Sequence, residues 1–521
     1  MSYIPLMPFI QNADLVNPPN WGYRVYPQKR SFFGFYHNSS PWLAGRVLGG
    51  TSNLNFNLYV RGQRKDYDLW AQQGAIGWSW KDIFGYFIRA ENNINYHNEF
   101  HGVGGPLTVS HSPYYSPLLK NFLGAVREMG LPIRDFNTDR HDSFYISQGT
   151  IEYGKRKNSY TAYIKPNLHR PNLRVMTSAL VTKILIDEFK RAKGVSYEYF
   201  NVTKIVYARK EIIISAGTVN TAKLLMLSGI GPREHLHELG IAVVADLPVG
   251  KNFHDHVTTS VIFTIDKPYS LHTLSFTPKD FMDYKFRGRG RLTSLAGVEV
   301  LGFLRTSVEK EGWSDILVAI SANSLLSDTG LPLLTPQVGF RKDVYINAFS
   351  RYKFKHTISC TPIFVRPKSR GFVKLKSDDP FDQPIINTNY FAKIEDLLSL
   401  IEGVKFCKAF GRTHSMRKVG TQEIESVFPM CDHLPYNSDE YMACVLRVFT
   451  GSLYHGSGTC KMGDPYDPRT VVDPTLRVKG IRNLRVADCS VMPTLVGGLP
   501  HATAVMIGEK AADLIRLEPY S

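Results

Sequence analysis

A strand, a glycine turn and a helix follow one another directly between residues 211 and 231, and this unit constrains the fold more than any other stretch. Residues 212–215 (IIIS) are rich in β-branched side chains, which is typical of a strand. Ala216 and Gly217 supply the turn, and an amphipathic helix then runs to Ser228 and Gly229. A turn of this kind directs backbone N–H groups at a phosphate. We therefore predict an α/β (α+β) protein with a phosphate-facing βα unit.

Composition excludes several other classes of protein. The chain has 521 residues, of which 43% are hydrophobic and 21% charged, which is ordinary for a globular protein and leaves room for a large core or two domains. Its formal charge of +16 is scattered rather than gathered in a tail, so it predicts only weak attraction to anionic surfaces. One Arg/Gly stretch, residues 285–291, could be read as RNA-binding, but it occurs once, between apolar runs. We expect no nucleic-acid partner, and no membrane span because no run of about 18 apolar residues occurs.

Further strands and one long helix are predicted on both sides of the βα unit. Short β-rich runs cover residues 172–177, 179–186, 195–199 and 206–215. Farther along, alternating apolar and polar residues predict an antiparallel sheet, and residues 394–410 predict a helix that ends at Gly411. The alternating runs are residues 258–264, 357–363 and 371–375.

Two histidines near the C-terminal end are the candidate catalytic residues. His455 stands in residues 454–463 (YHGSGTCKMG), and His501 stands in residues 499–504 (LPHATA). Removing the proton of an alcohol needs a base with a pKa near neutrality, and an imidazole provides one. A second polar group can bind the substrate oxygen and stabilise the developing alkoxide. Apolar residues at helical spacing follow Pro500, so His501 is predicted in the first turn of a helix.

A glycine-rich run precedes these elements in the chain. Residues 45–62 (GRVLGGTSNLNFNLYVRG) contain the adjacent Gly49 and Gly50, followed by small hydroxyl residues. Without a Cβ, this backbone can approach a flat ring or a phosphate closely. The run is therefore a candidate cofactor-binding loop.

Metal binding is the main competing interpretation. His235, His237, His254, Asp255 and His256 are all of metal-ligand type. However, the first two lie in a predicted helix, which directs residues two apart to different faces. We therefore predict no metal site. Serine hydrolase chemistry is also disfavoured, because the chain lacks a Gly-x-Ser-x-Gly elbow.

Taken in order, these motifs resemble those of the GMC (glucose-methanol-choline) flavin oxidoreductases, particularly the insect glucose dehydrogenase and ecdysone oxidase group. The match includes residues 45–62, 216–232, 249–257, 454–463, 483–495 and 499–504. The resemblance implies FAD as cofactor, an alcohol as substrate, hydride transfer to flavin N5, and oxygen or a quinone as electron acceptor. His455 and His501 then share substrate-oxygen binding and proton abstraction. Which of the two is the base stays open, with His455 preferred.

The resemblance also assigns cofactor contacts. Some relatives attach the flavin covalently through a histidine at the position of Leu54, so a leucine there implies non-covalent FAD. The residues expected along the flavin nucleotide are Gly50, Thr51, Asn55, Val181, Ala216, Gly217, Asp488, Ala502 and Thr503.

Two domains are expected from the same resemblance. Residues 1–120, 171–256 and 466–521 would form the FAD-binding domain, and residues 121–170 and 257–465 the substrate-binding domain, with an antiparallel sheet backed by helices. The Gly-x-Gly-x-x-Gly turn that opens such proteins is absent from this sequence. The chain is therefore expected to be a shortened form of a longer protein or a variant that binds FAD poorly or not at all. The alternative function is a non-catalytic remnant that acts as a binding protein.

Cysteines and targeting signals complete the expectations. Six cysteines include no C-x-x-C pair, and Cys431 and Cys444, thirteen residues apart, are the pair to test as a disulfide. Sequons occur at Asn38 and Asn201, but residues 1–10 lack the features of a signal peptide. Secretion is thus implied by the resemblance alone. The sequence leaves the alcohol and the oligomeric state open.

Overall fold

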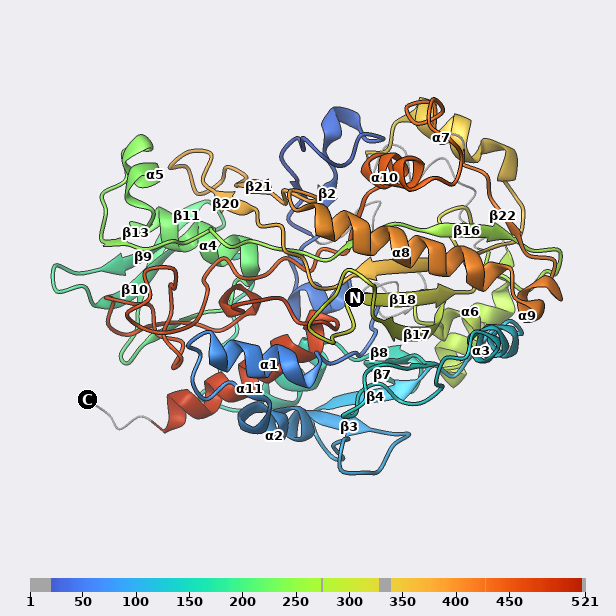
Figure 1. Ribbon diagram of the computed structural model, residues 1–521. Coiled ribbons are helices and arrows are strands. Elements are labelled where there is room, and N and C mark those ends of the chain that lie inside the picture. Colours follow the sequence, from blue (N-terminus) through green and yellow to red (C-terminus); the bar gives the residue numbers. More distant parts are fainter. Residues whose placement is uncertain (1–19, 273–274, 328–338, 427, 518–521) are drawn as a thin grey trace.

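The computed structural model describes residues 20–272, 275–327, 339–426 and 428–517. Helices and sheets are mixed along the chain, which confirms the predicted α/β class. Figure 1 shows a large sheet crossed by a long helix on one side of the molecule and a smaller group of strands and helices on the other. The division into the two domains predicted above stays a prediction.

The large sheet is antiparallel and assembles from distant segments. Its main path has the order β22-β16-β19-β18-β17-β5, and β15 pairs with both β19 and β23 at one side. Register places Val318 opposite Pro362 and Val261 opposite Cys360. The strands are β5 (Phe144–Ile146), β15 (Val257–Thr258), β16 (Val261–Thr264), β17 (Val298–Leu304), β18 (Ile316–Ser321), β19 (Thr357–Phe364), β22 (Gln422–Glu423) and β23 (Gly451–Ser452).

Helix α8 (Ile394–Gly411) lies across this sheet (Figure 1). Its buried residues include Leu397, Leu400 and Phe410, which pack into the main hydrophobic core. A disulfide between Cys360 of β19 and Cys407 of α8 ties the helix to the sheet. The predicted pair Cys431 and Cys444 is also bonded, which joins the loop before α10 (Asp439–Val448) to that helix.

The predicted βα unit is present on the other side of the molecule. Strand β12 (Ile212–Ile214) runs into helix α4 (Gly217–Leu227), and β12 pairs in parallel with β24 (Leu484–Val486). This parallel pair brings the C-terminal motif beside the βα turn. The preceding segment is an antiparallel meander of β9 (Ala179–Ile186), β10 (Ala192–Tyr199) and β11 (Val202–Tyr207).

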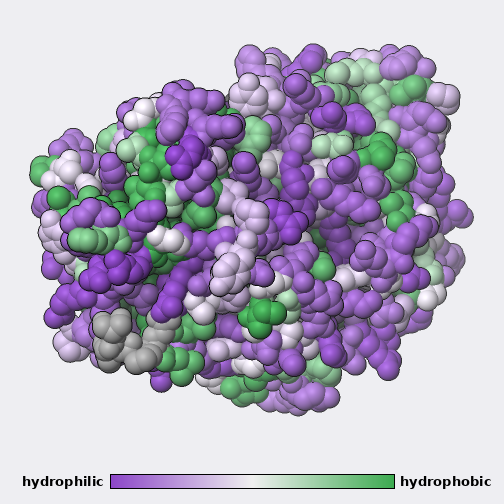
Figure 2. All heavy atoms as spheres, turned by 60° about the vertical axis from the view of Figure 1, so that its left-hand side comes forward, coloured by the Kyte–Doolittle hydropathy of each residue, from purple (hydrophilic) through white to green (hydrophobic). Residues whose placement is uncertain are grey.

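Strand β11 is exposed along its whole length. Hydrophobic side chains gather on the side of the molecule that carries the meander (Figure 2). The exposed ones include Phe200, Val202, Ile205, Val206 and Tyr207. Because successive strand residues point to opposite faces, β11 exposes apolar side chains on both of its faces.

Helix α11 (Pro500–Arg516) packs beside α2 (Trp80–Ala90), with α1 (Arg64–Gln72) next to it (Figure 1). Pro500 begins α11, because proline is tolerated where a helix has no preceding carbonyl to bond. His501 therefore lies in the first turn, as predicted. The hydroxyl of Tyr67 in α1 hydrogen-bonds that of Thr503 at 2.8 Å, which joins the two helices near this turn.

The other described elements form small pairs and single helices around these parts. The longer helices are α3 (Leu119–Glu128), α6 (Pro278–Arg287) and α7 (Lys342–Phe349), and the shorter ones α5 (Arg233–Glu238) and α9 (His414–Arg417). Further strands are β3 (Glu91–Asn93), β4 (Leu107–His111), β6 (Gln148–Gly149), β8 (Lys155–Arg156) and β20 (Phe372–Lys374).

One predicted strand is wrong. Residues 172–177 form no strand, and the backbone is irregular until β9 begins at Ala179. These residues are mostly exposed, so their β propensity has no neighbouring strand to pair with and no core to cover.

Candidate active site

His455 follows strand β23 and is held through its backbone by Asp255. The N–H of His455 donates to Oδ1 of Asp255 at 2.7 Å. The other carboxylate oxygen accepts the hydroxyl of Ser452 at 2.7 Å and the hydroxyl of Tyr390. One buried carboxylate thus gathers three donors and fixes the turn that carries His455.

The ring of His455 contacts a third histidine. Its Nδ1 lies 3.0 Å from Nδ1 of His256, and the two rings are nearly perpendicular, at 87°. Nε2 of His256 lies 3.1 Å from the carbonyl oxygen of Val496. His256 is fully buried and thus links the His455 turn to the segment that leads into α11.

The other histidines considered as metal ligands have structural partners. Nε2 of His254 accepts the N–H of Leu495 at 2.7 Å, and Nε2 of His235 accepts the N–H of Leu375 at 3.1 Å. Each ring therefore satisfies a buried backbone donor. Within the described ranges, no group of three or more His, Cys, Asp or Glu residues could hold a metal ion.

His501 is oriented by Asn55. The amide nitrogen Nδ2 of Asn55 lies 3.4 Å from Nδ1 of His501. The amide oxygen accepts Nη1 of Arg156 at 2.7 Å and the N–H of Asn57 at 3.2 Å. These two donors fix which way the amide points, so its NH₂ group faces the imidazole. Nδ1 of His501 is therefore an acceptor, and the ring proton of the neutral imidazole lies on Nε2.

The Nε2 atom of His501 is buried and has no hydrogen-bond partner among the described residues. A buried N–H without a partner is costly, and such groups are concentrated at functional sites. The atom is thus a donor available to a ligand.

Burial keeps both catalytic candidates neutral. It lowers the pKa of His455 to about 3 and the pKa of His501 to about 4, and the positive charge of Arg156 adds to the shift at His501. Both imidazoles are therefore uncharged at neutral pH, which is the form that can accept a proton. Burial also raises the pKa of Asp255 to about 6, against the hydrogen bonds that favour its ionised form.

The βα turn provides a cradle of backbone groups. Asp488 accepts the N–H of Gly217 at 2.9 Å and the hydroxyl of Thr221 at 2.6 Å, which joins the C-terminal motif to the start of α4. Gly217 has φ of +82° and Gly50 has φ of +55°, and a Cβ at either would meet no atom within 4 Å. Open space beside two glycines with left-handed φ fits the close approach of a nucleotide or flat ring. The residues present therefore fit FAD.

The other predicted contacts lie on the same elements in different surroundings. Thr51 is exposed, and its hydroxyl accepts the N–H of Gly45 at 3.1 Å. Val181 of β9 and Ala216 are exposed. Ala502 and Thr503 are buried in the first turn of α11. Their roles toward a cofactor stay predictions.

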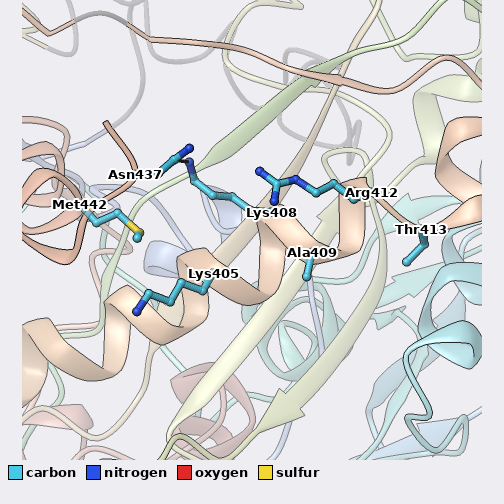
Figure 3. Close-up of a pocket in the computed structure, with 7 residues that line it drawn as sticks. All are labelled: Lys405, Lys408, Ala409, Arg412, Thr413, Asn437 and Met442. Atoms are coloured by element: carbon cyan, nitrogen blue, oxygen red, sulfur yellow. Dashed lines mark hydrogen bonds between the residues drawn. The ribbon is translucent and has the colours of Figure 1, made fainter. Parts of the chain in front are cut away.

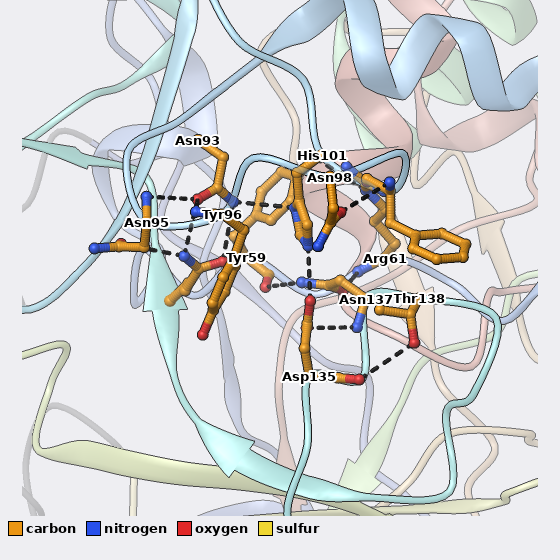
Figure 4. Close-up of polar contacts among 12 residues, drawn as sticks. Tyr59, Arg61, Asn93, Asn95, Tyr96, Asn98, His101, Asp135, Asn137 and Thr138 are labelled. Atoms are coloured by element: carbon orange, nitrogen blue, oxygen red, sulfur yellow. Dashed lines mark hydrogen bonds and ion pairs between the residues drawn. The ribbon is translucent and has the colours of Figure 1, made fainter.

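A buried ionic network supports the segment behind His501. Arg61 pairs with Glu91 of β3, and His101 lies between that carboxylate, at 3.0 Å, and Asp135, at 2.7 Å. Figure 4 shows Arg61, His101 and Asp135 converging with Asn93 and neighbouring polar groups. The N–H of Leu499 donates to the carbonyl of Val60, so the segment before α11 rests on the residue next to Arg61.

A separate cavity of about 540 Å³ lies at the C-terminal end of α8 (Figure 3). Its basic residues are paired, because Lys405 contacts Asp439 and Lys408 contacts Glu423, each at 2.6 Å. No lining residue contacts the histidine cluster. The cavity is therefore not an alternative candidate for the active site. Its lining residues are Lys405, Lys408, Ala409, Arg412, Thr413, Asn437 and Met442.

Sequence reasoning missed three side chains of this site. Asp255 and His256 are predicted only as metal-ligand types and as part of the matched residues 249–257, with no role beside His455, and Arg156 is not predicted at all. The segment 254–256, with charged or titratable side chains in three successive positions, was the available signal. Arg156 had no such signal, because it stands between Lys155 and Lys157, and a short basic run is ordinarily exposed.

Two family models match the chain, both described as GMC oxidoreductase. The N-terminal model matches residues 30–258 and the C-terminal model residues 367–508. Together they include Gly50, Asn55, Gly217, His455 and His501.

Several curated relatives are similar over nearly the whole chain. A glucose dehydrogenase [FAD, quinone] of Drosophila melanogaster is 35% identical over 95% of this chain and 78% of its own length. An alcohol dehydrogenase [acceptor] of Pseudomonas putida is 35% identical over 95% and 85%. The mitochondrial choline dehydrogenase of Homo sapiens is 35% identical over 96% and 80%.

Solved structures share the fold. A formate oxidase variant from Aspergillus oryzae has a TM-score of 0.86 at 25% identity and covers 99% of this chain and 91% of its own. An FAD-dependent oxidoreductase from Chaetomium thermophilum has a TM-score of 0.83 at 26% identity, with 99% and 92% covered.

Proposed function

The chain belongs to the GMC oxidoreductase family of FAD-dependent enzymes, and from that premise we propose that it oxidises the CH–OH group of a small alcohol to a carbonyl. A sugar, a sterol or another alcohol is the substrate, and oxygen or a quinone is the final electron acceptor. The observation that carries the proposal is the pair of neutral, partly buried imidazoles, His455 and His501, on the C-terminal segment that His256 contacts at Val496.

The two imidazoles supply the proton chemistry. One accepts the hydroxyl proton of the alcohol, so that the O–H bond breaks and an N–H bond forms. The other donates a hydrogen bond to the same oxygen as negative charge develops there. Nε2 of His501 carries a proton and lacks a partner among the described residues, which suits the second role. His455 then takes the first.

FAD supplies the hydride acceptor when it is bound. The residues that would hold it are the backbone at Gly50 and at Gly217, where open space lies beside each glycine. Leu54 offers no nucleophilic atom for a covalent bond, which supports non-covalent binding. Asp488 positions the Gly217 turn through the backbone N–H.

The proposal is tested first by a visible spectrum of the purified chain before and after addition of FAD. Flavin bands near about 370 and 450 nm that stay with the protein through gel filtration are the expected result. A protein that stays colourless after incubation with FAD would favour the binding-protein alternative.

Turnover is then measured with a panel of sugars, sterols and simple alcohols, with oxygen and with a quinone as separate acceptors. His455→Ala is expected to lower kcat by about 10²-fold or more, the range typical of lost acid–base catalysis. His237→Ala is the matched control, because that histidine is exposed on α5. Equal activity of the two variants would contradict the proposal.

A further inference from the structure

We propose that His256 is a positioning residue that fixes the tautomer of His455 and leaves Nε2 of His455 as the proton-accepting atom. The inference rests on the proposed function, in which His455 is the base, and explains why Nε2 of His455 is free to accept the proton. Two contacts carry it, one between His455 and His256 and one between His256 and Val496.

The tautomer of His256 follows from its carbonyl contact. Nε2 of His256 faces the carbonyl oxygen of Val496 at 3.1 Å, and a carbonyl oxygen can only accept. The ring also faces the backbone of Val365, and of these two neighbours it is the 3.1 Å bond to Val496 that places the proton on Nε2. His256 is buried without exposure to solvent, and this burial holds its pKa well below the ordinary value, so the ring is neutral and has one N–H. Its Nδ1 is then a lone-pair acceptor.

The tautomer of His455 follows in turn. The two Nδ1 atoms lie 3.0 Å apart, which is a hydrogen-bond distance, and two lone pairs cannot bond to each other. Nδ1 of His455 must therefore be the donor. The neutral ring has a single proton, so Nε2 of His455 has a free lone pair. That atom makes no hydrogen bond to any described residue.

The backbone contact keeps this geometry in place. Oδ1 of Asp255 accepts a hydrogen bond from the backbone N–H of His455 at 2.7 Å, and Asp255 and His256 are neighbours in the chain. The base is thus fixed at two points, one on its backbone and one on its ring. The histidine pair is complementary as well, because His455 presents an acceptor and His501 a donor, each at Nε2.

Nitrogen-15 NMR of histidine-labelled protein reads the tautomer directly, without turnover. The signals of His455 are identified by their loss in His455→Gln. The expected result is an Nδ1–H tautomer in the wild type and its loss in His256→Phe, which keeps a ring but has no acceptor. An Nε2–H tautomer of His455 in the wild type would overturn the inference.

Kinetics of the FAD-loaded protein provides the second readout. His256→Phe is expected to lower kcat by about 10²-fold, as for loss of a general base, with little change in KM. His256→Gln keeps an acceptor and a donor in one carboxamide and is expected to recover a large part of the loss. Full activity in His256→Phe, or no recovery in His256→Gln with the fold intact, would overturn it.

The two proposals fail separately. If His455→Ala retains full activity, the proposed function fails. If His455→Ala is inactive while His256→Phe keeps both the tautomer and kcat, only the positioning role fails. Thermal unfolding and retained flavin absorbance confirm that each variant is folded.

Discussion

Asp255 accepts the backbone N–H of His455 at 2.7 Å although the two residues are 200 positions apart in the chain. Its other oxygen accepts the hydroxyls of Ser452 and Tyr390. A single buried carboxylate therefore decides the shape of the turn before the candidate base. Tyr454 in this turn has φ of +59°, which is uncommon for a residue other than glycine. The surrounding hydrogen bonds hold that strained conformation.

Asp255→Ala is expected to destabilise the protein by about 3 kcal/mol, because three buried donors lose their acceptor at once. Asp255→Asn keeps one acceptor oxygen and is expected to cost less. Chemical denaturation of both variants measures the effect. Asp142→Ala is the control, since that carboxylate is 76% exposed and its pair with Arg134 lies at the surface. Equal stability of Asp255→Ala and Asp142→Ala would contradict the assigned role.

Activity is expected to persist into acidic solution. The base must be unprotonated, and burial lowers the pKa of His455 to about 3 and the pKa of His501 to about 4. Protonation therefore removes activity only as the pH falls through these values. The acid limb of kcat/KM should lie below pH 5, well under about 6.5, the ordinary pKa of histidine. Return to pH 7 after each acid incubation checks that the protein was not unfolded. An acid limb near 6.5 would show that the imidazoles are solvated.

Asn55→Asp is expected to exchange the donor and acceptor nitrogens of the His501 ring. A carboxylate has no N–H, so Nδ1 of His501 would have to carry the ring proton and Nε2 would lose it. Removal of one donor to a developing oxyanion lowers kcat by about 10²- to 10³-fold. Steady-state kinetics with the best alcohol measures the change. Asn172→Asp, at an exposed position, introduces the same charge as a control. An unchanged kcat in Asn55→Asp would exclude the donor role of His501.

His101→Gln is expected to remove about 3–5 kcal/mol of stability, because it breaks a buried ionic network between Glu91 and Asp135. Burial opposes the charged form of His101, but the hydrogen bonds that its ring donates to Asp135 and Glu91 outweigh this and raise its pKa. The pKa values of Glu91 and Asp135 are lowered by Arg61 and His101, again against burial. His97→Gln, at an exposed position, is the control.

The difference in stability between the wild type and His101→Gln depends on pH, and the direction of this dependence follows from the pKa shifts. A raised histidine pKa gives stability that is complete below about 6.5 and is lost as the pH rises through the folded-state value. Lowered carboxylate pKa values give stability that is complete above about 4.5 and is lost as the pH falls. The stability gap between wild type and His101→Gln should therefore be widest between about pH 4.5 and 6.5. A gap that widens above pH 8 would contradict this assignment.

Local patterns sufficed for some parts of the site and not for others. The βα turn at Gly217 and the helix start at Pro500 were predictable because each depends on a few adjacent residues with special backbone preferences. The partners of His455 were not, since they come from residues about 200 positions earlier and no local pattern reports such a contact. The strand expected at residues 172–177 is absent because a strand, too, depends on a partner from elsewhere in the chain. Its propensity was present, but no partner strand lies beside it.

Histidine patterns were also ambiguous at the level of sequence. His254 and His256 are two residues apart, as in a chelating strand, yet one ring holds the N–H of Leu495 and the other contacts His455. Metal binding and hydrogen bonding use the same ring nitrogens. Only the positions of the neighbouring groups distinguish the two uses.

Three consecutive residues join two segments of the chain. His254 bonds Leu495 and His256 bonds Val496, while Asp255 and His256 both bond His455. The turn that carries His455 is therefore tied to residues 495–496, which lie a few positions ahead of His501 in the chain. Loss or gain of one residue within 254–256 would shift all of these hydrogen bonds out of register together.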